Sequence, residues 1–188
     1  DILSLMAYAL PEFTSWFDTV PERLLVVSAR DGMWRGALSG PGSLYLHADR
    51  PLVSENATSP LLHELVHVLM QRQAVPGQDW IDEGLAEYLG LLMLHESGGI
   101  TGDRFDDALA WQRRWATEAD DLGGRNARGP ETARAVGVFA ALHEELGKKA
   151  FRAFMREVSA PGPDLTVDLL REIAERAHEG PVESLPAD

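Results

Sequence analysis

The feature that most constrains this chain is the pentapeptide HELVH, in which His63 and His67 are four residues apart. Residues at this spacing lie on one face of an α-helix, so the two imidazoles can aim at a single point. A Ser-Pro pair at 59–60 is typical of a helix start, with serine as the N-cap and proline as the first helical residue. The sequence therefore predicts a helix from this pair to about Gln73, ending at the Pro-Gly pair 76–77.

A second segment, WIDEGLAEY at 80–88, supplies carboxylates at a usable distance. The short connection 73–78 is expected to fold a second helix back against the first, with Glu83 at its start facing the histidines. Zinc binds neutral imidazole and carboxylate ligands, and a catalytic zinc keeps its fourth position open to water. We therefore predict one Zn²⁺ per chain, held by His63, His67 and Glu83.

Two further glutamates belong to the same constellation. Glu64 lies about 100° round the helix from His63, where it can accept a proton from an attacking water and deliver it to a leaving amine. Glu87 lies one turn after Glu83, and a carboxylate there can hold the free N–H of a ligand imidazole. The alternatives are that Glu87 is a surface glutamate and that the two histidines are unconnected residues of an exposed helix.

HELVH followed by WIDEGLAEY resembles the gluzincin metallopeptidases, the group that includes thermolysin and the zinc aminopeptidases, and within them the peptidase-MA-like bacterial proteins. The resemblance implies a zinc-dependent peptidase with a peptide or protein substrate. It implies His63, His67 and Glu83 as the zinc ligands, Glu64 as the general base and Glu87 as the carboxylate that orients a ligand histidine. The short gap between His67 and Glu83 favours a minimal member of the group.

One part of the family pattern is missing. The peptidase-MA-like proteins often carry a tyrosine near 133–135 that stabilises the developing oxyanion, and this chain has ETARA at 131–135. Other residues could substitute for it: Tyr45, His47, Arg125, Arg128, Arg134 and His143. The missing tyrosine leaves open a second hypothesis, a zinc-binding scaffold or interaction domain with weak or no turnover.

The segment SLYLHA at 43–48 alternates apolar and polar residues, which predicts a half-exposed strand. Pro51 nearby favours an edge of the sheet. We expect this strand to line the cleft beside the zinc and to bind an extended peptide by strand addition. It contains no glutamate of the kind with which aminopeptidases of this group hold a free amine, so cleavage within peptides is favoured over removal of terminal residues.

Composition limits the partners. The formal net charge of −13 argues against nucleic acid and anionic membranes. No apolar run is long enough for a transmembrane helix. The absence of cysteine excludes disulfides and thiolate ligands. The chain starts at Asp1 without a methionine or a charged leader, which favours a mature fragment of an extracytoplasmic protein, periplasmic or secreted.

The order of elements predicts an α+β fold in a single metallopeptidase-like domain, 1–188. Residues 1–97 would form a small N-terminal β-sheet beside the two motif helices, and residues 98–188 a helical part that closes the cleft. Strands are expected at 23–29 and 43–48, with a loop at 33–42 between them. Beyond the motif helices, further helices are expected over these ranges: 2–17, 101–118, 131–146, 149–158 and 164–177.

Overall fold

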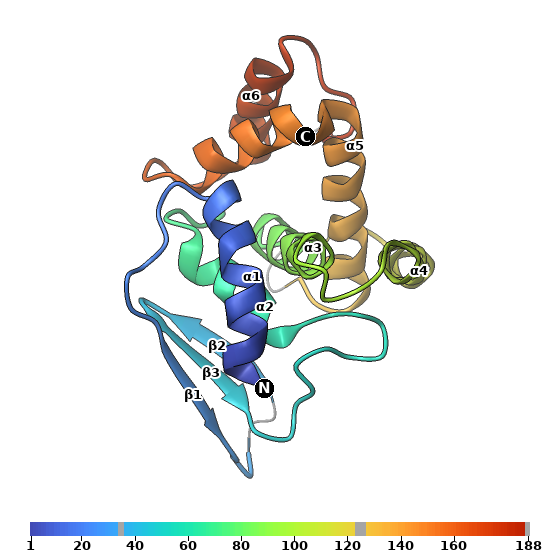
Figure 1. Ribbon diagram of the computed structural model, residues 1–188. Helices are drawn as coiled ribbons and strands as arrows, with labels where there is room; N and C mark the ends of the chain where they lie inside the picture. Colours follow the sequence, from blue (N-terminus) through green and yellow to red (C-terminus); the bar gives the residue numbers. More distant parts are fainter. Residues whose placement is uncertain (34–35, 123–126, 187–188) are drawn as a thin grey trace.

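The computed structural model describes residues 1–33, 36–122 and 127–186, and it confirms an α+β fold with a helical C-terminal part. A three-stranded sheet lies at one end of the molecule and α6 at the other, and the remaining helices lie round α3 (Figure 1). The helices are α1 (Ile2–Trp16), α2 (Pro60–Leu69), α3 (Trp80–Glu96), α4 (Gly102–Trp115), α5 (Pro130–Ser159) and α6 (Val167–His178), with a 3₁₀ turn at Ala116–Glu118. The strands are β1 (Leu25–Ala29), β2 (Ala37–Gly40) and β3 (Ser43–His47).

The strand order is β1-β3-β2, with β1 parallel and β2 antiparallel to β3. The prediction that the strand at 43–48 forms an edge is therefore wrong, because β3 is paired on both sides. The segment 33–42 was expected to be a loop, but it contains the strand β2, which the sequence patterns did not predict. Pro41 and Gly42 close a tight hairpin between β2 and β3, and Gly42 adopts a φ of +66° that favours glycine. Proline and glycine mark a turn here rather than a long loop.

Helix α2 starts as predicted, with the Ser59 hydroxyl accepting from the backbone N–H of Leu62 at 3.4 Å. It ends at Leu69, four residues earlier than expected. The following segment bonds instead to the chain before α6: Leu165 donates to the Gln73 carbonyl and Val75 donates to the Leu165 carbonyl. These long-range backbone bonds replace another turn of helix.

Helix α3 forms the centre of the core. Twelve of its residues are buried, and α2, α5, α1 and α4 pack around it. Two glycines allow the close approaches: a Cβ at Gly84 would lie 2.5 Å from the Cβ of Ala135 on α5, and one at Gly90 would lie 3.2 Å from the His63 backbone nitrogen. The motif helices α2 and α3 are therefore held at short range by backbone contact.

The two helices predicted at 131–146 and 149–158 are confirmed. They are the two segments of α5, which meet at a kink at Gly147, where the backbone is not helical and φ is +72°. Glycine adopts this conformation without the strain that a side chain would add. Among the described residues, no helix has both the length and the apolarity needed to cross a membrane.

Candidate metal centre

The structure brings three potential ligands to one point. His63 and His67 approach each other to 3.1 Å between their Nε2 atoms. The Glu83 carboxylate lies 3.4 Å from Nε2 of His63 and 3.7 Å from Nε2 of His67. Among the described residues, these three offer ligand atoms that all lie within 4.8 Å of one another. The arrangement follows from the four-residue spacing on α2 and from the short connection that places the first turn of α3 opposite.

A carboxylate outside the three-residue cluster, Glu87, sets the orientation of His63. Its Nδ1 lies 3.0 Å from Oε2 of Glu87, so the imidazole donates there and presents its Nε2 to the centre of the cluster. The other Glu87 oxygen accepts from Nε2 of Gln112 on α4 at 3.4 Å. A chain of hydrogen bonds therefore runs from α4 through α3 to α2.

The charges at the cluster favour a cation. Burial opposes protonation of His63, but its contacts with Glu83 and Glu87 outweigh burial and raise its pKa to about 10. Burial and the neighbouring His63 lower the pKa of His67 to about 4. Although burial opposes it, the hydrogen bond and charge of His63 lower the pKa of Glu83. Without a metal, His63 thus carries a positive charge beside the carboxylates of Glu83 and Glu87, and His67 is neutral.

Glu64 lies beside the cluster and is half-buried. Burial raises its pKa, while a hydrogen bond with the Ser39 side chain and the charge of His63 act in the opposite direction. A carboxylate with a raised pKa is better matched to proton transfer near neutral pH. Ser39 belongs to β2, so this strand, which sequence reasoning missed, reaches the side chain expected to act as the base.

A cavity of about 250 Å³ opens beside the cluster. Its lining includes His63, Glu83, Glu87 and Gln112, together with Trp115 from the end of α4, Arg128 from the segment before α5 and Thr132 from the first turn of α5. The Arg128 guanidinium contributes to lowering the pKa of Glu83.

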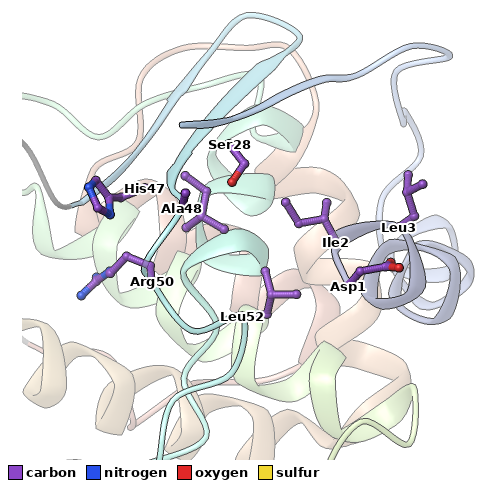
Figure 2. Close-up of a pocket in the computed structure, with 9 residues that line it drawn as sticks. Asp1, Ile2, Leu3, Ser28, His47, Ala48, Arg50 and Leu52 are labelled. Atoms are coloured by element: carbon purple, nitrogen blue, oxygen red, sulfur yellow. The ribbon is translucent and has the colours of Figure 1, made fainter. Parts of the chain in front are cut away.

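A larger hollow of about 400 Å³ lies between the start of α1 and β3, and none of the cluster residues lines it (Figure 2). Its walls come from Ile2 and Leu3 on one side and from His47 and Arg50 on the other. The hollow therefore belongs to a different part of the molecule from the candidate metal centre.

The other predicted contacts make different interactions. Tyr45 donates to the carbonyl of Ala29 at 3.2 Å, and buried His47 contacts the Asp31 carbonyl and the Asp49 amide. Nδ1 of His143 and the Tyr88 hydroxyl share a hydrogen bond of 2.6 Å, and the imidazole stacks on Phe151. Arg134 donates to the carbonyls of Ala119 and Asp120. None of these four lines the cavity at the cluster, whereas Arg128 does; Arg125 lies outside the described residues.

The donor set fits zinc. It consists of two imidazole nitrogens and one carboxylate, half-buried, with one imidazole fixed by an outer carboxylate. A set of three protein ligands is typical of catalytic rather than structural zinc sites, which have four.

No protein-family model and no curated protein matches the chain. Solved structures do match its fold, and these neighbours are M1 zinc metallopeptidases. One is a two-domain M1 zinc metallopeptidase mutant bound to L-tryptophan, at 22% identity and a TM-score of 0.63, covering 93% of this chain and 42% of its own. A second is the M1 zinc metallopeptidase from Deinococcus radiodurans, at 23% identity and a TM-score of 0.62, covering 94% of this chain and 40% of its own.

A third is a mutant of the enzyme from Deinococcus radiodurans bound to a Tyr-Ser-Ala substrate, at 23% identity and a TM-score of 0.59. It covers 97% of this chain and 44% of its own. The chain thus spans less than half the length of these structures. At this level of identity the likeness defines a shared fold.

Proposed function

We propose that this chain is the catalytic domain of a zinc-dependent peptidase. The observation that carries the proposal is the convergence of His63, His67 and Glu83, with Glu64 half-buried beside them. Nothing in helix packing calls for two imidazoles and a carboxylate to meet at a half-buried point. The fold shared with M1 zinc metallopeptidases adds support.

In this proposal His63, His67 and Glu83 hold the zinc, which when bound would act as a Lewis acid toward water and a substrate carbonyl. Glu64 accepts the proton of the attacking water and transfers it to the leaving amine. Its raised pKa suits both directions of transfer. Glu87 keeps His63 in the tautomer that leaves Nε2 unprotonated for the metal.

The substrate strand is proposed to add to β2. Among the described residues, β2 pairs only with β3, so its other edge is open to an extended peptide. Ser39 places this strand next to Glu64. The sequences of β2 and β3, ALSG and SLYLH, contain no carboxylate to hold a free amino group, which supports cleavage within peptides.

Arg128 is proposed to stabilise the developing oxyanion. It is the permanent cation among the described residues that line the cavity, and its charge reaches Glu83. Thr132 lines the same wall, but its side chain is short. A guanidinium has several N–H donors and can replace a tyrosine hydroxyl in this role.

The test is a pair of glutamate variants. Glu64→Gln keeps the shape and removes the base, so cleavage of a peptide library should fall by at least ~10²-fold while zinc affinity changes little. Glu83→Gln should weaken zinc binding itself, because a neutral amide replaces an anionic ligand. Exposed Glu144→Gln on α5 is the matched control and should change neither.

The outcomes separate three possibilities. If the wild-type chain binds zinc but cleaves nothing, and Glu64→Gln behaves like it, the scaffold hypothesis replaces the peptidase. Loss of zinc in Glu64→Gln would show that this residue is not the base. Failure of the wild-type chain to bind stoichiometric zinc after reconstitution would exclude both zinc hypotheses.

A further inference from the structure

Gln112 occupies an unusual position for an amide side chain. It is 3% exposed, and with Ala108 it forms the buried side of α4. Its Nε2 donates to Glu87, but its Oε1 is buried and has no hydrogen-bond partner among the described residues. Burying an unpaired amide oxygen disfavours folding, and a methionine of similar length would fill the same space without this cost. Packing of α4 therefore does not explain a glutamine here.

The one hydrogen bond that Gln112 makes explains the residue better. Glu87 has two oxygens, and both are used: Oε2 contacts Nδ1 of His63 at 3.0 Å, and Oε1 accepts from Gln112 at 3.4 Å. The amide orientation follows from the partner, since turning the Gln112 oxygen toward a carboxylate would place two acceptors against each other. Gln112 thus restrains the carboxylate that restrains His63.

We propose that Gln112 is a positioning residue, which sets the aim of His63 at the metal by fixing Glu87. The inference rests on the proposed zinc site. Without the amide, the flexible Glu87 side chain can rotate away from its productive orientation, and His63 loses its fixed tautomer. Partners of this outer kind typically change metal affinity by about 10- to 100-fold.

The variant that tests the proposal is Gln112→Met, which keeps the volume and removes the donor. The zinc dissociation constant, measured by competition with a chromophoric chelator, should rise by about 10-fold, the lower end of the range for such partners. Unfolding of the metal-free chain, followed by circular dichroism, should be unchanged or shifted to higher temperature, because a buried unpaired oxygen has been removed. Gln112→Leu, with a different shape, should give the same rise if the lost donor is the cause.

Two controls separate positioning from a structural role. Ala108→Gly weakens α4 one turn earlier without touching Glu87, so it should lower thermal stability and leave zinc affinity unchanged. In a Glu87→Ala background, Gln112→Met should change the dissociation constant by less than about twofold, because Gln112 acts only through Glu87.

An unchanged dissociation constant in Gln112→Met, or an equal rise in the Glu87→Ala background, would overturn the inference and leave the proposed function intact. A wild-type chain that binds no zinc would overturn both.

Discussion

The contact between α3 and α5 offers a test of the structure through one methyl group. A Cβ added at Gly84 would lie 2.5 Å from the Cβ of Ala135 and 3.2 Å from its carbonyl carbon. Ordinary contacts of this type are 3.5–4.0 Å, and a backbone atom cannot rotate away. Gly84→Ala must therefore push the two helices apart by about 1 Å or force a comparable distortion.

The size of the effect is the difference of two terms. Overpacking a well-packed core destabilises by about 1–3 kcal/mol, and replacing glycine by alanine in a helix contributes about 1 kcal/mol in the opposite direction. We expect Gly84→Ala to lower the free energy of unfolding by up to about 2 kcal/mol, and Tm falls by about 2–4 °C for each 1 kcal/mol in a chain of this size. Because Gly84 follows Glu83, zinc affinity should weaken as well.

The assay is thermal and urea unfolding in the presence of a chelator, so that metal binding does not contribute. Gly137 on α5 is the matched control, since a Cβ there meets nothing within 4 Å, and Gly137→Ala should stabilise by about 0.5–1 kcal/mol. Opposite signs for the two substitutions are the expected result. Equal stabilisation by both would refute the close α3–α5 crossing.

Two titratable groups, His143 and Glu64, give predictions about pH, the first for stability and the second for activity. Burial lowers the pKa of His143, so the unfolded chain binds its proton more readily and stability falls as pH drops below about 6.5. Urea unfolding at pH 7.5 and 5.5 should show a smaller loss in His143→Leu, and an equal loss would contradict this assignment. Ser39→Ala removes a hydrogen bond that lowers the pKa of Glu64, so the acid limb of kcat/KM against pH should move to higher pH. If the acid limb stays at the same pH, Ser39 does not influence the pKa of Glu64.

The parts of the fold that local patterns could predict are the motif helices. The serine at 59 and the proline at 60 fix where α2 starts, and helical periodicity alone brings His63 and His67 to one face. The short connection to α3 then leaves few places for Glu83, which lies opposite them. Local sequence patterns do not predict the order of strands in the sheet. Alternation at 43–48 predicts a strand with one buried face, but it says nothing about how many neighbours pair with that strand.

The residues that support the site were also beyond local reasoning, for a definite physical reason. Gln112 and Glu87 are 25 positions apart, and their contact depends on how closely α4 approaches α3. The crossings of α3 with its other neighbours are short because Gly84 and Gly90 carry no side chain. A sequence shows these glycines as poor helix formers, and only the packed structure reveals them as contact points. The candidate ligands are thus encoded within two adjacent helices, whereas Ser39 on β2, which contacts Glu64, and Gln112 on α4, which contacts Glu87, are encoded in distant segments.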